Sequence, residues 1–328
     1  MNAHVTGPVR HALRAVAREI LGFRADYPLE TVPEAAAPAS LRYHVYGDRL
    51  FLDELDLDGQ GVPRRRYRLL GLHYNPLFVA WWGLHHLEKA ARTGDDAHLG
   101  VFRAQLDWLR INAVVRDDDA VVWPCHFDWQ EGRARLRAPW ISAMYQGVVI
   151  SALVRGFRLT RDPKLLDLAH GGSRVFALDV GAGGVRSREA GRVLYEEYPA
   201  EPLPRILDGF LMSLIGLHDL SVETGDPGVR RLFDAGVDGL VHHLPWWSYR
   251  GKWSWYGAHG YLCPPQYHAL NRAGLLVLAR LAGAPDLRAT AEAWDPARLS
   301  RWDRIEMLSA FAVTKNAARL RLRNERGD

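Results

Sequence analysis

The residue types best suited to chemistry stand together in one short stretch, YEEYP at residues 195–199. Further prolines at 202 and 204 exclude a helix here, so we predict a loop with a fixed backbone. Apolar residues then recur at helical spacing over residues 206–220, which indicates a helix that faces a core. A rigid loop of ionisable side chains mounted on a buried helix is typical of an active site, and an acidic surface loop is the alternative.

Two kinds of chemistry fit these residues. Glu196 and Glu197 suggest glycoside hydrolysis, but neighbouring side chains diverge, and that reaction needs two carboxyls facing each other across a sugar. A partner acid would have to come from elsewhere, such as Asp128 or Asp208. Phenols near arginine and histidine suit instead the removal of a proton next to a carboxylate. Many tyrosines fall in or beside the segments that we predict to face a cavity: Tyr74, Tyr145, Tyr195, Tyr198, Tyr256, Tyr261 and Tyr267.

The sequence offers little support for metal or cofactor chemistry. It contains no Gly-rich phosphate loop, no HExxH motif and no nucleophile elbow. The histidine pairs at 85–86 and 242–243 are adjacent, whereas ligands on one helical face normally stand four residues apart. Two cysteines are too few for a zinc site or a disulfide framework. We therefore predict no metal and no cofactor.

A repeat predicts the architecture that positions the loop. Each copy has an apolar helix, a short loop and a second, amphipathic helix, and the loops align at Thr93, Thr160, Thr224 and Ala282. The first helix of each pair is apolar on nearly all sides, so it must be enclosed, whereas the second has a polar face. An inner ring of helices inside an outer ring satisfies both patterns. We predict a mainly α fold, an incomplete (α/α) toroid or barrel of helical hairpins.

Long loops between the helix pairs should gather at one end of this toroid and line its cavity. They span residues 114–139, 187–204 and 245–266, and each is rich in aromatic residues, acids and arginine. Aromatic faces stack on sugar rings, and charged side chains bind hydroxyls and carboxylates, so this composition favours a carbohydrate cleft. The alternative is that the tryptophans only cap the helical ring.

The N-terminal part reads differently. We predict an amphipathic helix over residues 8–22 and a short β-hairpin within residues 41–57, and hence an N-terminal region at 1–61 before a barrel domain at 62–328. A net charge of +4 fits an acidic polysaccharide or oligosaccharide. We expect no nucleic acid partner and no membrane association. In the absence of a secretory apolar region, we expect a cytoplasmic protein.

Longer motifs resemble the C-terminal domain of the glucuronyl C5-epimerases. They are residues 138–162, APWISAMYQGVVISALVRGFRLTRD, and residues 195–220, YEEYPAEPLPRILDGFLMSLIGLHDL. The resemblance extends over about residues 62–280 through LHYNP, WSWYGAH and QYH. The family converts D-glucuronate to L-iduronate in heparosan and heparan sulfate, and its fold joins a β-rich part to an (α/α) barrel. Membership would also imply a homodimer.

Carried over by position, the resemblance implicates Tyr198, Tyr256, Tyr267 and Glu197 in catalysis. We predict Tyr198 and Tyr267 as the pair that removes and returns the C5 proton, positioned by the other two, without assigning base and acid. A phenol has a reference pKa of about 10, so we expect cationic neighbours and hydrogen bonds to lower the pKa of the base. Further substrate contacts are predicted for Tyr74, Tyr145, Gln146, Glu196, Arg205, Trp255, His259 and His268.

Two departures affect substrate binding more than catalysis. The family usually has arginine where this chain has His259, and a second histidine where this chain has Asn271. Gly257 also stands in the place of an aspartate. We therefore predict an epimerase acting at C5 of a glucuronate in an acidic glycan or glucuronide. A uronate lyase, a glycoside hydrolase and a non-catalytic glycan-binding module are the alternatives.

Overall fold

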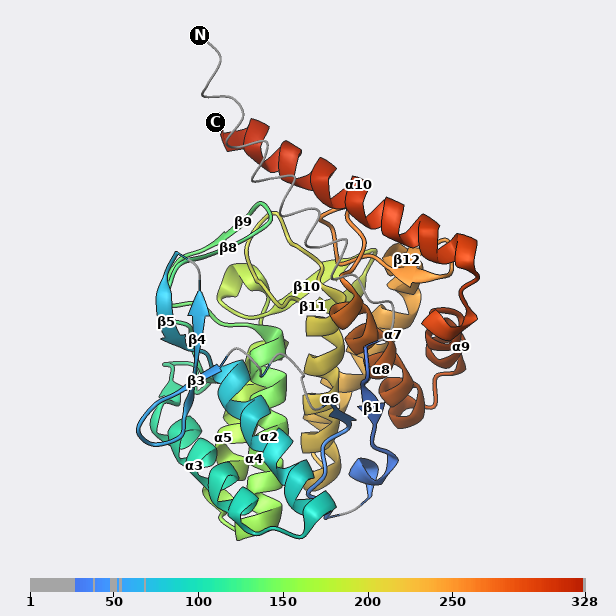
Figure 1. Ribbon diagram of the computed structural model, residues 1–328. Helices are drawn as coiled ribbons and strands as arrows, with labels where there is room; N and C mark the ends of the chain where they lie inside the picture. The colour runs from blue at the N-terminus through green and yellow to red at the C-terminus, as the bar shows by residue number, and fades with distance from the viewer. Residues whose placement is uncertain (1–26, 38, 48–51, 53–54, 68, 327–328) are drawn as a thin grey trace.

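The described part of the chain is built mainly from paired helices (Figure 1). A computed structural model describes residues 27–37, 39–47, 52, 55–67 and 69–326, so the helix predicted over residues 8–22 lies outside the described residues. The inner helices are α2 (Pro76–Thr93), α4 (Ala143–Thr160), α6 (Leu207–Thr224) and α8 (Pro265–Ala282). The outer helices are α3 (Ala97–Ile111), α5 (Pro163–Ser173), α7 (Pro227–His243) and α9 (Pro285–Ala293).

Local sequence signals set the ends of the inner helices. α2 begins after Asn75, whose side chain accepts a hydrogen bond from the Leu77 amide, and α4 begins after Ser142, which caps it in the same way. α2, α6 and α8 each end before a glycine with positive φ, which an L side chain would disfavour. The inner helices therefore end at the predicted positions, and the predicted repeat of helix pairs is confirmed.

The ring is held together by unusually close contact between α4 and α6. Both helices are buried along almost their whole length. A Cβ atom on Gly147 would lie 2.5 Å from the Cα of Ser213, and one on Gly216 would lie 2.1 Å from the carbonyl oxygen of Gly147. Only glycine allows the two backbones to approach this closely, so these positions fix the geometry of the inner ring.

The ring of helices is an incomplete (α/α) toroid, as predicted. The N-terminal segment lies in the gap between α8 and α2. Strands β1 (Glu30–Thr31) and β2 (Val45–Tyr46) pair antiparallel and contact α8. On the other side, the ring of Tyr46 stacks on His85 of α2 at a centroid distance of 5.2 Å, and Arg42 binds Glu88 of the same helix. The segment thus bridges the two ends of the open ring.

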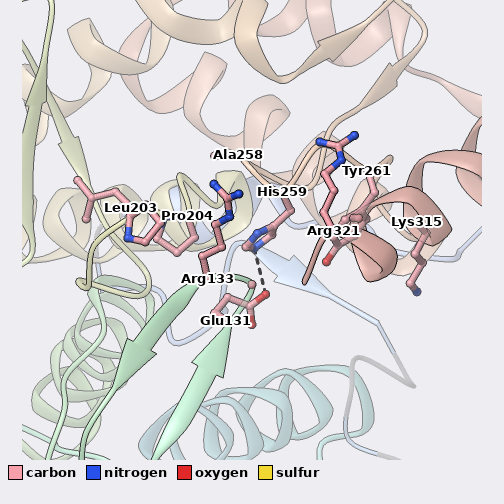
Figure 2. A pocket seen from close by; sticks show the side chains of 12 residues that line it. Glu131, Arg133, Leu203, Pro204, Ala258, His259, Tyr261, Lys315 and Arg321 are labelled. Atoms are coloured by element: carbon pink, nitrogen blue, oxygen red, sulfur yellow. Dashed lines mark ion pairs between the residues drawn. The ribbon is translucent and has the colours of Figure 1, made fainter. Parts of the chain in front are cut away.

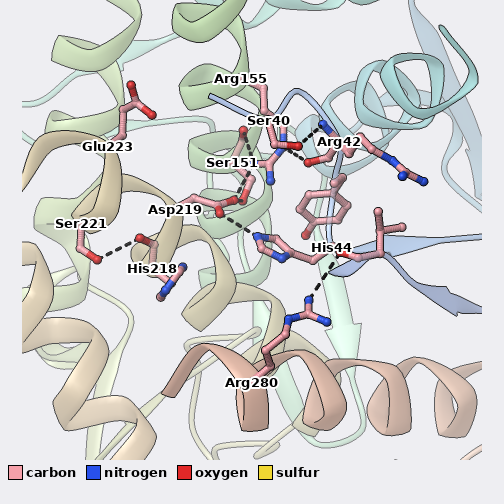
Figure 3. A network of polar contacts seen from close by, with 12 residues as sticks. Ser40, Arg42, His44, Ser151, Arg155, His218, Asp219, Ser221, Glu223 and Arg280 are labelled. Carbon is pink, nitrogen blue, oxygen red and sulfur yellow. Dashed lines mark hydrogen bonds and ion pairs between the residues drawn. The ribbon is translucent and has the colours of Figure 1, made fainter. Parts of the chain in front are cut away.

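A buried polar network fixes this segment to the inner helices (Figure 3). The carboxylate of Asp219 on α6 lies 2.8 Å from Nε2 of His44, accepts a hydrogen bond from Ser151 at 2.7 Å, and binds Arg155 at 2.6 Å. Arg155 also donates to the backbone carbonyl of Arg42. Because these groups are buried, the network is stable only when every charge has its partner.

Short strands occupy the loops between the helices. β3 (Leu55–Leu57), β4 (Pro63–Tyr67) and β5 (Gly71–Tyr74) form an antiparallel sheet before α2. The remaining hairpins pair β6 (Val114–Val115) with β7 (Val121–Val122), β8 (Trp129–Glu131) with β9 (Ala134–Leu136), β10 (Arg186–Glu189) with β11 (Arg192–Tyr195), and β12 (Ser248–Tyr249) with β13 (Trp253–Ser254). Short 3₁₀ turns lie at Pro33–Ala36, Arg174–Ala177, Val180–Ala182, Leu244–Trp247 and Pro296–Arg298.

The hairpin predicted within residues 41–57 falls partly on residues 48–51 and 53–54, which lie outside the described residues, and the described strands of this stretch do not pair with each other. β2 pairs with β1 and β3 pairs with β4, so the two strands in this stretch pair with partners outside it. The pairing of β3 with β4 crosses the predicted boundary between residues 61 and 62, and the main core includes Tyr43 and Val45 from the N-terminal side. The boundary itself stays a prediction.

A last helix, α10 (Arg301–Arg326), lies across the end of the ring where the long loops gather (Figure 1). The sequence pattern did not predict this helix. Lys252 and Arg250 of the β12–β13 turn bind Asp303 and Glu306, and the hydroxyl of Thr314 accepts a hydrogen bond from the Leu262 amide. Among the helices that the structure describes, none combines the length and apolar character needed to cross a membrane.

Candidate active site

A pocket of about 250 Å³ opens at the loop end of the ring. Every inner helix contributes to it, together with the loops before α4, α6 and α8 and strand β4. Aromatic side chains form most of its wall: Tyr67, Phe78, Trp81, Phe127, Trp129, Trp140, Tyr145, Tyr198, Tyr256 and Tyr267. The charged side chains that line it are Arg65, Arg66, Glu131, Glu197 and Asp208.

The YEEYP loop supplies one side of the pocket. The ring of Tyr198 lies 5.9 Å from that of Trp140, which in turn lies 5.7 Å from Tyr145 at the start of α4. Glu197 packs against the first turn of α6, where a Cβ atom on Gly209 would come within 2.4 Å of the Cβ of Glu197. The glycine therefore allows the carboxyl to lie directly beside α6.

The segment before α8 supplies another side. Tyr267 lies in the first turn of α8, and its ring meets Tyr256 edge to face at 5.5 Å. Gly257 packs on the loop before α6, and a Cβ there would lie 2.6 Å from the carbonyl oxygen of Pro204. This contact leaves no room for a larger residue at position 257. The structure thus brings the predicted Tyr198, Tyr256, Tyr267 and Glu197 into one pocket.

The pocket holds buried carboxyls that resist ionisation. Burial raises the pKa of Asp208 to about 7, although backbone amides at the start of α6 favour its charged form. Burial and the neighbouring Asp208 raise the pKa of Glu197 well above its usual range, and a hydrogen bond with Tyr198 opposes this. As the two carboxyls interact, they titrate as a pair, and the pair keeps a proton at neutral pH.

The tyrosines are shifted in the same direction. Burial and the charge of Glu197 raise the pKa of Tyr198, and burial and the charge of Asp208 raise the pKa of Tyr267. The expectation that cations would lower the pKa of the base is wrong, because the neighbours that act most strongly on these phenols are carboxyls. Arg65 lowers the pKa of Tyr267, but its effect is smaller than that of burial.

Arg65 and Arg66 on β4 are pocket residues that the sequence analysis missed. The guanidinium of Arg65 lies over the ring of Phe78 at 4.6 Å, which holds this cation beside α2. Both arginines lie on strand β4 (Pro63–Tyr67), which the sequence pattern did not predict. The run of three arginines at residues 64–66, a few residues before LHYNP, was the signal that could have revealed them.

Seven of the eight predicted binding residues lie outside the lining of this pocket. Tyr74 is 40% exposed and donates a hydrogen bond to Asp58. Gln146 is fully buried; its side-chain oxygen accepts a hydrogen bond from the Trp123 amide, and its nitrogen donates to the backbone carbonyls of Val121 and Gly172. Trp255 packs edge to face against Tyr249 at 5.2 Å. Tyr145, by contrast, lines the pocket.

The other predicted binding residues also have clear surroundings. Glu196 is buried and accepts hydrogen bonds from Ser187 and Arg205, away from the lining of the pocket. His268 is buried, stacks on Trp253 at 3.6 Å and contacts Ser254 and the carbonyl of Trp294, and burial lowers its pKa to about 3. His259 lines a second, adjoining cavity. Among the described residues, no group of three or more His, Cys, Asp or Glu could hold a metal ion.

Fold and site together define an (α/α) ring protein with an aromatic, carboxyl-containing pocket suited to a sugar ring. Residues 116–296 match the model of a family described as "D-glucuronyl C5-epimerase C-terminus". The chain therefore belongs to the D-glucuronyl C5-epimerase family, and the predicted resemblance is confirmed.

Individual relatives extend this finding. The D-glucuronyl C5-epimerase of Caenorhabditis elegans is 33% identical over 220 residues, which cover 61% of this chain and 35% of that protein. An uncharacterized protein of Methanocaldococcus jannaschii is 26% identical over 167 residues, covering 50% of this chain and 53% of that one. The chain thus spans only about a third to a half of the length of these relatives.

One solved structure with partial similarity is a glycoside hydrolase family 76 mannosidase from Bacteroides thetaiotaomicron. It aligns with a TM-score of 0.49 and 12% identity, covering 82% of this chain and 76% of that chain. A family 76 α-mannanase from the same organism aligns with a TM-score of 0.47 and 11% identity, covering 84% of this chain and 79% of that one. These values are too low to bear on function.

Proposed function

We propose that this protein inverts C5 of a D-glucuronate residue in an acidic glycan, giving L-iduronate. The observation that carries the proposal is the meeting of Tyr198 and Tyr267 with two arginines in one pocket of a family member. The two tyrosines come from different elements, the loop before α6 and the first turn of α8. Epimerisation needs such an arrangement, because one group removes the proton and another returns a proton to the opposite face of the sugar.

Binding comes first in this mechanism. The uronate carboxylate needs cations, and Arg65 and Arg66 are the cationic side chains among the residues that line the described pocket. Loss of the C5 proton leaves an enediolate-like dianion in which the C–H bonding electrons spread onto the carboxylate. Preorganised guanidinium groups stabilise that second charge more than they stabilise the ground state, which is how they accelerate the step.

Each tyrosine then acts with a carboxyl. Tyr267 takes the C5 proton and passes its own phenolic proton to Asp208, whose pKa of about 7 leaves it partly ionised near neutral pH. On the other face, Tyr198 gives its proton to C5 and recovers one from Glu197, which holds its proton more tightly. The phenols have raised pKa values, so each proton transfer to or from C5 must be accompanied by transfer to or from the carboxyl. Proton exchange between Asp208 and Glu197 restores the starting state.

The experiment is solvent-deuterium incorporation at C5 of a heparosan oligosaccharide, followed by NMR with ultraviolet absorbance and reducing ends monitored in parallel. Exchange without absorbance supports the epimerase. Absorbance from an unsaturated uronate would show a lyase, which begins with the same proton abstraction but expels the C4 oxygen. Binding without any reaction would leave a glycan-binding module.

The tyrosine pair is tested by Tyr198→Phe and Tyr267→Phe, each expected to slow exchange about 10²–10⁴-fold. Tyr74→Phe is the matched control, because that hydroxyl lies outside the pocket and binds Asp58. Full exchange activity in both pocket variants would exclude the two-tyrosine mechanism.

A glycoside hydrolase is the second candidate. It is favoured by one observation, the buried Glu197–Asp208 pair with the pKa of Asp208 raised to about 7, which suits a general acid. New reducing ends without deuterium at C5 would support it. The predicted homodimer and cytoplasmic location stay predictions, which light scattering and cell fractionation can check.

A further inference from the structure

Figure 2 shows a second cavity, of about 340 Å³. It adjoins the pocket that holds Tyr198 and Tyr267, which we call the reaction pocket. It lies between the β8–β9 hairpin, the loop before α6, the segment before α8 and the outer helix α10. The ionisable side chains that line it are Glu131, Arg133, His259, Tyr261, Lys315 and Arg321. It is larger than the reaction pocket, and nothing in the proposed proton transfer uses it.

The two cavities share a border formed by side chains. Glu131 lines both of them. Tyr256 lines the reaction pocket, and its ring lies nearly parallel to those of His259 and Tyr261 at 5.6 and 5.2 Å. A polymer whose uronate occupies the reaction pocket would therefore reach the second cavity with its next sugars.

The charges of the two cavities differ in sign. The reaction pocket has more carboxyls than arginines among its lining residues, whereas the second cavity has three permanent cations, Arg133, Lys315 and Arg321. The one carboxylate among the residues that line the second cavity, Glu131, lies 3.1 Å from Nε2 of His259. The second cavity is thus a cationic site beside a carboxyl-rich one.

The turn of the β8–β9 hairpin packs closely against His259 at the border of the two cavities. A Cβ atom on Gly132 would lie 2.4 Å from both Cε1 and Nδ1 of the imidazole. Only a glycine lets the turn, which also has a positive φ here, approach the ring so closely. His259 stands where the family usually has arginine, and α10 lies outside the matched residues 116–296. Two of the three cations, Lys315 and Arg321, come from α10.

We propose that the second cavity binds an anionic group, a carboxylate or a sulfate, on the sugars that flank the reacting uronate, and that α10 supplies two of its cations. This inference rests on the proposed function, because it takes the reaction pocket as the site of the uronate. It makes the protein selective for an acidic chain over a single glucuronide. The shared chemistry of carboxylate and sulfate is an oxyanion that lysine and arginine can bind.

The test is a ligand-observed NMR titration of the full chain at low salt with an N-acetylated tetrasaccharide containing two uronates, its N-sulfated form, and methyl glucuronide. We expect the double variant K315Q/R321Q to weaken tetrasaccharide binding about 3- to 10-fold, as two partly exposed ion contacts allow. Binding of methyl glucuronide should stay unchanged. If the double variant weakens binding of only the N-sulfated tetrasaccharide, the group bound is a sulfate. If it weakens binding of both tetrasaccharides, the group bound is a carboxylate.

The matched control is K164Q/R288Q, which removes one lysine and one arginine from exposed positions on the outer helices α5 and α9. Equal loss in the control, equal loss for methyl glucuronide, or no tetrasaccharide binding by the unmodified protein would each overturn the proposal. Deuterium exchange is measured separately. If tetrasaccharide binding depends on Lys315 and Arg321 but no deuterium is incorporated at C5, the proposed epimerase activity is refuted while the anion-binding site is supported.

Discussion

Replacing Asp208 with asparagine tests the electrostatics of the reaction pocket directly. The pKa of this carboxyl is about 7 in the folded protein against an ordinary value of 3.8, because its burial penalises the charged form. The folded state therefore holds a proton that the unfolded chain has already released. The stability associated with that proton is complete below pH 3.8 and is lost as pH rises towards 7.

The magnitude follows from linkage. Each pH unit between the two pKa values changes the free energy of unfolding by about 1.36 kcal/mol, so Asp208 costs about 3 kcal/mol between pH 5 and pH 7. Asp208→Asn removes this loss, and it keeps an oxygen that the backbone amides of α6 can still bind. We expect the variant to gain about 3 kcal/mol over the unmodified protein between pH 5 and pH 8.

Urea unfolding at several pH values measures the difference. Asp128→Asn is the control, because Asp128 is exposed and its pKa is lowered by the Ala138 amide and by Arg137 rather than raised. It should show no such gain at high pH. If the difference between Asp208→Asn and the unmodified protein were the same at pH 5 and pH 8, the reasoning about this buried carboxyl would be refuted.

Further predictions concern the frame and the substrate. Asp219→Asn should destabilise the protein by about 3–5 kcal/mol in urea unfolding, because it leaves the buried Arg155 without its charge partner; a loss under 1 kcal/mol would contradict this. Gly147→Ala should cost at least about 1–3 kcal/mol by forcing α4 from α6, while Gly100→Ala, with open space around it, should be neutral or stabilising. Arg65→Gln should raise the KM for the uronate about 10- to 100-fold, and an unchanged KM would remove this guanidinium from carboxylate binding.

The repeat was readable from the sequence because its signals are local. The threonine and alanine positions that aligned the copies are the last residues of the inner helices, and in three of the four cases a glycine with positive φ follows. Helix periodicity and capping need only neighbours within a few residues. The same holds for the aromatic loops, whose tyrosines do meet in one pocket.

The N-terminal strands were not readable in this way. The turn-like sequence around Gly47 suggested a hairpin, yet β2 pairs with β1 and β3 pairs with β4. Strand pairing depends on partners brought together by the rest of the fold, so a short alternating pattern cannot specify which strand it joins. For the same reason β4, with Arg65 and Arg66, was not recognised as part of the pocket. α10 was also missed, although it forms a wall of the second cavity.

The direction of the pKa shifts of the pocket tyrosines was the property of the site hardest to predict from the sequence. Tyr198 and Tyr267 were expected to need cations, since a phenolate base at neutral pH requires a lowered pKa. The folded pocket instead surrounds them with Glu131, Glu197 and Asp208, and burial acts in the same direction. A neutral phenol that must be deprotonated as it reacts needs a nearby acceptor that is itself close to its pKa, and Asp208 at about 7 meets that requirement. In the proposed mechanism, Glu197 of the YEEYP loop and Asp208 of α6 therefore act as proton stores for the tyrosines rather than as a hydrolytic pair. Deuterium exchange and the Asp208→Asn measurements can jointly test this proposal.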